Sequence, residues 1–219
     1  MPIMNRVLPT TRSTARSRSL FVVALACSLT FSACASPVAP SAKPANFYEA
    51  VRSDVEKFWK DFFSSHGATY SPIAKMQLFD RQVVSACQFD PDPGPFYCPV
   101  DRGVYLDSGF MQTQLSNFGD FGAAVVVAHE IGHHIQNLLG FNANITLHEL
   151  QADCMAGGWM KDADARHLLE VSDSLEAARS LFNAGDPFAS PWFRQNAHGS
   201  PQQRVEAFKS GFLFGASSC

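Results

Sequence analysis

The sequence predicts an α+β fold that is rich in helices and has a small antiparallel sheet beside its central helix. Apolar residues recur at helical spacing in residues 46–64 and again in residues 121–139, which favours two long helices. Two short apolar runs, 96–98 and 104–106, flank a turn at 101–103 and favour a pair of strands. The chain has 219 residues, 46% of them hydrophobic, and is therefore large enough to build one packed core.

The first 34 residues have the pattern of an export signal. Four arginines and no acidic residue precede a mostly apolar run from Leu20 to Phe31, which is too short to span a bilayer. The small residues that follow lead to Cys34, as in a bacterial lipoprotein signal, although an aliphatic residue is more usual than Phe31 three positions before that cysteine. The alternative is ordinary secretory cleavage after Ala33-Cys34-Ala35. In both cases we expect the mature protein outside the cytoplasm, either secreted or bound to a membrane through a lipid on Cys34.

Residues 35–46, rich in proline, alanine and serine, are expected to form a disordered tether. A tether suits a surface-anchored domain and so favours lipidation. The domain itself is expected to span residues 47–219. Without residues 1–35 the chain keeps 13 basic and 20 acidic residues, a balance of −7, and no basic cluster. Nucleic acid is therefore excluded as an expected partner.

The central helix carries the motif H-E-x-x-H, formed by His129, Glu130 and His133. Residues i and i+4 of a helix share one face, so the two imidazoles can bind one ion. Glu130 then lies beside that ion, in the position of the general base of a zinc protease. The alternative is a polar group on the solvated face of a core helix. It is disfavoured because the apolar residues 123–128 predict a buried helix, in which an unpaired polar cluster is costly.

A second helix is predicted to complete this site. Glu149 and Asp153 are also four residues apart, so both can face the same ion. We expect Glu149 to be the third ligand and Asp153 to hydrogen-bond the free ring nitrogen of a ligand histidine, which fixes its tautomer. Two histidines and one carboxylate leave one position of a Zn²⁺ ion open, and this is the arrangement of a catalytic zinc site.

The remaining segments are expected to surround these two helices. Asn46 is the candidate cap of the first helix, whose aromatic stripe is expected to pack in the core. Further strands are expected at 76–79 and 83–86, and further helices at 110–115, 171–182 and 201–214, the last with Ser200 as its cap.

Four cysteines lie beyond the signal: Cys87, Cys98, Cys154 and Cys219. An even number in an exported chain predicts disulfides, for which three pairings are possible. In one of them Cys87–Cys98 closes a short loop, which leaves Cys154–Cys219 to fix the C-terminus to the helix of Glu149. Zinc binding by these cysteines is disfavoured because the sequence has no C-x-x-C spacing among them.

Five segments of the chain resemble the bacterial neutral zinc metallopeptidases. They are 96–99, 104–107, 128–140 (AHEIGHHIQNLLG), 149–157 (ELQADCMAG) and 198–205 (HGSPQQRV). Together they span most of the mature chain. Before residue 70, the sequence contains little beyond the core domain. The resemblance implies a zincin-like fold and peptidase activity. Similarity to the gluzincins, in which E-x-x-x-D supplies the glutamate ligand, supports Glu149 as a ligand.

The expected reaction is therefore zinc-assisted hydrolysis of a peptide or protein substrate. Glu130 is expected to take a proton from a water activated by the zinc and to pass it to the leaving amine. His198 is the first candidate for stabilising the oxyanion and Tyr105 the second, with a loop or cap role as the alternative for His198. His134 and His148 each follow or precede a ligand and point about 100° away from it, so they are expected to be structural or to line the pocket wall.

Two other classes of function are weighed against this one. A surface-anchored zinc-binding protein with little turnover would need no base, and the presence of Glu130 argues against it. A hydrolase of non-peptide substrates could use the same metal centre.

Overall fold

A computed structural model describes residues 45–87, 94–187 and 197–219 of the chain. The elements in order are α1 (Ala45–Ser65), β1 (Lys75–Phe79), β2 (Phe96–Cys98), β3 (Gly103–Asp107), α2 (Ser108–Phe118), α3 (Asp120–Leu139), α4 (Ile145–Ala165), α5 (Asp173–Asn183) and α6 (Pro201–Phe214), followed by a short 3₁₀ turn at Ala216–Ser218. The domain is thus α+β and helix-rich, as predicted. Within the described residues, none of these helices has the length and apolar character needed to cross a bilayer.

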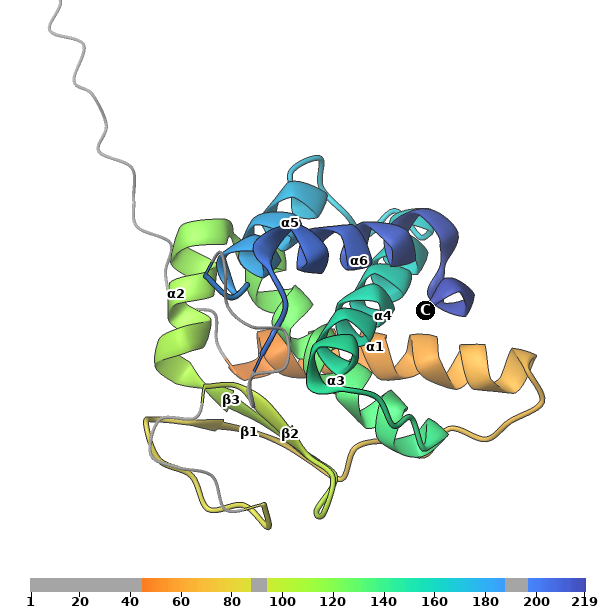
Figure 1. The fold of residues 1–219 in the computed structure, drawn as a ribbon, viewed down its shortest axis with the longest axis horizontal. Helices are drawn as coiled ribbons and strands as arrows, with labels where there is room; N and C mark the ends of the chain where they lie inside the picture. Colours follow the sequence, from red (N-terminus) through yellow and green to blue (C-terminus); the bar gives the residue numbers. More distant parts are fainter. Residues whose placement is uncertain (1–44, 88–93, 188–196) are drawn as a thin grey trace, which may run out of the picture. The chain divides into compact units, whose positions relative to one another are not determined.

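The sheet lies at one end of the domain, and helices cover one of its faces (Figure 1). β3 is the central strand; β1 runs parallel to it and β2 antiparallel. The predicted pairing of 96–98 with 104–106 is confirmed, but the expectation of a purely antiparallel sheet is wrong. The β1–β3 pairing joins segments that are distant in the sequence, and no turn between adjacent strands sets its direction.

Residues 83–86 do not form the strand that their apolar pattern suggested. The structure gives them no ladder partner, and the side chain of Val84 is 93% exposed. Cys87, which follows this segment, is joined to Cys98 at the end of β2 by a disulfide. The segment is therefore a connection fixed at its end by a covalent bond.

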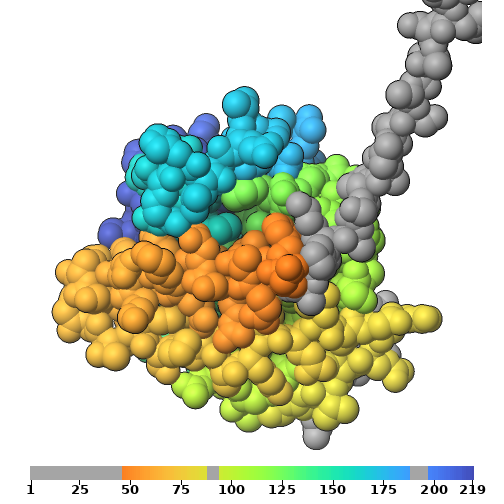
Figure 2. Space-filling model, turned by 180° about the vertical axis from the view of Figure 1, so that it is seen from behind, coloured from red at the N-terminus to blue at the C-terminus, as the bar shows by residue number. Residues whose placement is uncertain are grey.

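The core lies between the sheet and the helices. Along β3, Val104 and Leu106 face the main core, whereas Tyr105 joins Phe79 and Phe96 in a small cluster on the other face of the sheet. On α1, Val55 and Trp59 are buried one turn apart, which confirms that the aromatic stripe of this helix packs in the core. Seen from behind, α1 crosses the face of the domain as an orange band, with the segment that follows it below and the end of α4 above (Figure 2).

The predicted helix boundaries are largely confirmed, but α1 already begins at Ala45, so Asn46 lies inside this helix and is not its cap. α3 ends at Leu139, and the capping residue Gly140 adopts the left-handed conformation that glycine tolerates best. α6 begins at Ser200 with a complete capping box, in which Gln203 is the reciprocal partner, and Pro201 takes the first helical position.

A second disulfide, Cys154–Cys219, ties the end of the chain to α4. Of the three possible pairings, the structure therefore has Cys87–Cys98 with Cys154–Cys219. The signal residues, including Cys34, and the first ten residues of the expected tether lie outside the described residues.

Candidate metal centre

The site is built from α3 and α4, which approach each other unusually closely. A Cβ atom added to Gly132 would lie 3.1 Å from the Cα of Ala152, so only glycine allows this approach without a shift of the helices. Gly132 lies between His129 and His133, and Ala152 precedes Asp153. The close contact therefore brings the two expected ligand pairs face to face.

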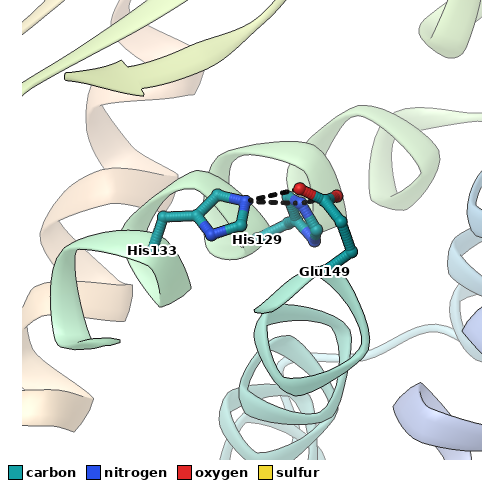
Figure 3. A group of neighbouring side chains, drawn as sticks. All are labelled: His129, His133 and Glu149. Carbon is teal, nitrogen blue, oxygen red and sulfur yellow. Dashed lines mark hydrogen bonds and ion pairs between the residues drawn. The ribbon is translucent and has the colours of Figure 1, made fainter. Parts of the chain in front are cut away.

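Three ligand atoms converge between these helices, from His129, His133 and Glu149 (Figure 3). The two histidine Nε2 atoms are 3.1 Å apart. The Glu149 carboxylate lies 3.3 Å from Nε2 of His129 and 3.5 Å from Nε2 of His133. Zinc–ligand bonds of about 2.0–2.1 Å place the ligands of a tetrahedral ion about 3.3 Å apart. The two Nε2 atoms and the Glu149 carboxylate, which faces His129 with Oε2 and His133 with Oε1, therefore form a triangle of groups spaced like the ligands on one face of a zinc coordination sphere.

The chemistry of the three donors also calls for a cation between them. The other ring nitrogen of each histidine faces an oxygen acceptor, Asp153 for His129 and Gln136 for His133. Each neutral ring therefore carries its proton on Nδ1 and directs a lone pair from Nε2 towards the carboxylate of Glu149. Such lone pairs repel one another unless a proton or a metal ion lies between them, so the residues present fit zinc.

Asp153 holds His129 in this orientation. Its Oδ1 atom accepts a hydrogen bond of 2.7 Å from Nδ1 of His129, as expected from the sequence. Asp153 is fully buried, and Arg204 of α6 binds both of its oxygens, at 2.7 and 2.8 Å. Burial raises the pKa of Asp153, but Arg204 and His129 outweigh it and keep that pKa below its ordinary value. The carboxylate is thus charged and fixed from both sides.

Arg204 was missed by sequence reasoning. It belongs to the segment 198–205, which resembles the family, but nothing in its spacing relates it to residue 153. It is 4% exposed, and its Nη1 atom donates a hydrogen bond to the carbonyl oxygen of Ala184 at 3.1 Å. Its contact with Asp153 arises because α6 packs closely on α4, where glycines 157 and 211 leave no space for a Cβ atom.

The charges around His129 favour its protonated form whenever no metal is bound. Burial lowers the pKa of His129, whereas the carboxylates of Asp153 and Glu149 raise it, to about 10. Burial raises the pKa of Glu149, but the neighbouring rings of His129 and His133 outweigh it and hold that pKa well below its ordinary value. Metal binding must therefore displace a proton from this group of side chains.

Glu130 lies beside the triangle without belonging to it. Its side chain is 6% exposed, and burial raises its pKa against the opposing effect of His129 and His133. A buried carboxylate next to an ion, with an elevated pKa, is the arrangement expected of a group that accepts and releases a proton.

Gln136 is the second residue that sequence reasoning missed. Its side-chain oxygen lies 2.8 Å from Nδ1 of His133, and the side chain is 2% exposed. The signal was present in the sequence, because Gln136 follows His133 by three residues and therefore shares its face of the helix.

The two neighbouring histidines are structural, as expected. His134 is fully buried on the side of α3 that faces the sheet, where it contacts the Tyr97 hydroxyl at 2.9 Å and the Ser71 carbonyl oxygen at 2.7 Å. His148 accepts a hydrogen bond from the backbone of Ala143 and contacts Gln136.

The two oxyanion candidates differ in their placement. Tyr105 faces away from α3, on the other side of the sheet, and its hydroxyl binds Asp101 at 2.5 Å, so the structure contradicts this candidate. His198 lies in the loop before α6 with 49% of its side chain exposed, and its ring nitrogen is 3.5 Å from a carboxylate oxygen of Asp186. The next residue, Gly199, is next to Leu150, which follows Glu149 on α4.

Comparison with known sequences agrees with this geometry. The family described as "putative neutral zinc metallopeptidase" matches residues 28–219. The chain is 32% identical over 194 residues to the uncharacterized protein YpfJ of Escherichia coli K12, covering 77% of this chain and 67% of the relative. It is 31% identical over 202 residues to the uncharacterized protein Mb2605 of Mycobacterium bovis, covering 76% of this chain and 66% of the relative. No solved structure gives a significant match.

Proposed function

The chain belongs to the family of neutral zinc metallopeptidases, and we propose that it hydrolyses peptide bonds with zinc bound by His129, His133 and Glu149. The observation that carries this proposal is the convergence of two imidazole nitrogens, 3.1 Å apart, with the Glu149 carboxylate, which lies 3.3 Å from one of them through Oε2 and 3.5 Å from the other through Oε1; such spacings suit three ligands of one tetrahedral ion. Zinc at this site would polarise a substrate carbonyl and lower the pKa of a water molecule to about 7.

Glu130 is the proposed general base. It follows the ligand His129 directly, and its buried carboxylate is not one of the three converging donors. It can therefore take a proton from the attacking water and deliver it to the leaving amine without being needed to hold the ion.

His198 is the proposed donor to the developing oxyanion. Its main-chain N–H donates to Asp186 at 2.8 Å, and the ring lies near the same carboxylate, so the loop presents a partly exposed imidazole in a fixed position. The loop packs on α4 one residue beyond Glu149. This position supports a role at the substrate carbonyl, for which a positioned donor is required.

We further propose that the protein acts outside the cytoplasm on a peptide or protein substrate. The two disulfides support export, because such bonds persist in oxidising compartments. Lipidation at Cys34 and plain secretion are distinguished by labelling the native host with a lipid precursor. Label on the mature protein would establish the lipid anchor, and its absence would leave secretion.

Digestion of a peptide library by the zinc-loaded protein tests the proposed activity. We expect cleavage that a chelator abolishes and zinc restores, with about one zinc per chain. The matched control is the double variant His129→Ala/His133→Ala, which should bind no zinc and cleave nothing. Zinc binding by the parent with no cleavage would instead favour a zinc-binding protein, and zinc retained by the double variant would refute the site.

A further inference from the structure

The side-chain amide of Gln136 is surrounded by four hydrogen-bond partners. Its nitrogen donates to the carbonyl oxygen of His148 at 2.7 Å and to the side-chain oxygen of Gln151 at 3.1 Å. Its oxygen faces Nδ1 of His133 at 2.8 Å and Nδ1 of His148 at 3.3 Å. An amide has two donor hydrogens and an oxygen that accepts twice, so this one is fully used.

The network allows only one orientation of this amide. The partners on its nitrogen side are both oxygens that must accept a hydrogen bond, so the NH₂ group has to point towards them. Gln151 is in turn oriented by Cys219, because its own nitrogen donates to the main-chain oxygen of Cys219 at 3.1 Å. Turning either amide over would bring two oxygens, or two N–H groups, against each other.

The protonation of His148 agrees with this orientation. Its Nε2 atom accepts a hydrogen bond from the backbone N–H of Ala143 at 3.1 Å and so carries no proton. The proton of the neutral ring is therefore on Nδ1, directed at the oxygen of Gln136. Gln136 thus presents an acceptor to both imidazole rings, while its nitrogen donates to the main-chain oxygen of His148.

We propose that Gln136 is a positioning residue for the metal centre, which fixes His133 as the Nδ1–H tautomer and so leaves Nε2 free to bind zinc. The inference rests on the proposed zinc site, which it deepens by naming the group that prepares its second histidine. Gln151 and the Cys219 oxygen support it by holding the amide of Gln136 in one orientation.

The proposal is tested with Gln136→Leu, which keeps the approximate volume of the side chain and removes both hydrogen-bonding groups. In the parent, ¹⁵N chemical shifts of the metal-free protein should show the neutral His133 ring protonated on Nδ1. In Gln136→Leu this preference should be lost, and zinc affinity, measured by competition with a chromophoric chelator, should fall by about 10–100-fold.

Two further variants separate this role from general packing. Gln136→Glu keeps an oxygen acceptor for His133, so it should retain the Nδ1–H tautomer and bind zinc more tightly than Gln136→Leu. Its second oxygen faces the oxygens of His148 and Gln151, so it should also lower the stability of the metal-free protein. Gln114→Leu is the matched control, because Gln114 is also 2% exposed and hydrogen-bonded, but to Ser180, away from the site. Gln114→Leu should leave both the tautomer of His133 and the zinc affinity unchanged.

Parent-like tautomer and zinc affinity in Gln136→Leu would overturn the proposal, as would an equal loss of zinc affinity in Gln114→Leu. If Gln136→Leu does not fold, Gln151→Leu decides, since it should weaken zinc binding relative to the parent; parent-like zinc affinity in Gln151→Leu would then overturn the proposal. If the parent binds no zinc, the proposed function fails, while the tautomer of His133 in the metal-free variants still decides the role of Gln136.

Discussion

The two histidines of the candidate metal centre are supported in different ways. His129 is held by a charged pair, in which Asp153 accepts its Nδ1 proton and Arg204 binds both oxygens of that carboxylate. His133 is held by the neutral amide of Gln136. Both partners fix the ring, and the carboxylate of Asp153 also raises the pKa of His129.

The charge balance of the site explains the difference. Glu130, Glu149 and Asp153 are three largely buried carboxylates, and Arg204 is the one buried guanidinium that the described residues place against them. One guanidinium and a divalent zinc ion would neutralise all three. A second carboxylate in the place of Gln136 would leave a negative charge uncompensated in a buried site, which is costly.

The charged support should be the more vulnerable of the two. In Arg204→Met the stem of the side chain is kept, but Asp153 loses its guanidinium partner while it stays fully buried. Removing one partner of a buried pair typically costs about 3–5 kcal/mol. We expect a loss of that size in the free energy of unfolding of the metal-free protein, measured with urea, together with weaker zinc binding.

Arg166→Met is the matched control for this variant. Arg166 forms a similar two-bond pair with Asp54, but that pair is partly exposed and joins α1 to α4 away from the metal. We expect Arg166→Met to lower the free energy of unfolding by less than Arg204→Met does and to leave zinc affinity unchanged. Equal losses in both variants would mean that burial does not set the cost of the charged support.

The neutral support should depend on the second disulfide. Replacing Cys154 and Cys219 by serine removes a disulfide between residues that are 65 apart in the sequence. We expect the free energy of unfolding to fall by about 2–4 kcal/mol. Because the oxygen of Cys219 accepts a hydrogen bond from Gln151, zinc affinity should fall as well. Unfolding and chelator competition on the same samples measure both effects.

The Cys87–Cys98 pair provides the comparison. It lies at the sheet, and its replacement by serines should lower stability without changing zinc affinity. A parent-like zinc affinity in the Cys154/Cys219 variant would show that Cys219 is not needed to hold the amide of Gln136 in place.

The smallest effect is expected at Asp54. Burial raises the pKa of this carboxyl, but hydrogen bonds from Arg166 and Trp159 outweigh it and lower the pKa below 3.8. The pair therefore stabilises the protein fully at pH values well above 3.8. This stabilisation is lost as the pH falls through the lowered pKa of Asp54 in the folded protein. Asp54→Asn should cost about 1 kcal/mol at pH 7, after allowance for solvent screening, and the difference from the parent should shrink towards pH 3.

Asp61→Asn, in an exposed pair with Lys57 on the same helix, serves as its control and should not change stability measurably. A constant effect of Asp54→Asn between pH 7 and pH 3 would show that the carboxylate charge is not what stabilises the α1–α4 contact.

The pairing of the candidate ligand residues within each helix could be predicted from the sequence, because helical periodicity alone determines which residues of one helix share a face. His129 and His133 share a face of one helix wherever that helix packs, and the same holds for Glu149 and Asp153 on the next. The fold class and most helix boundaries followed in the same way, from apolar spacing and capping residues.

The rest depends on contacts between distant segments. Arg204 reaches Asp153 only because α6 packs on α4, and the parallel pairing of β1 with β3 has no local determinant. Tyr105 is a different case, since strand alternation between Val104 and Leu106 already places its side chain on the opposite face from the core. That signal was available and would have excluded Tyr105 as an oxyanion donor.

The most direct test of the account is the variant Glu130→Gln, with zinc content and peptide cleavage measured on the same preparation. Gln has nearly the shape of Glu but cannot accept the proton, so zinc should stay at about one per chain while the rate of cleavage falls by about 10²–10⁴. Glu149→Gln should instead lose zinc first, because it removes a ligand. Cleavage at the parent rate by zinc-loaded Glu130→Gln would contradict the proposed mechanism.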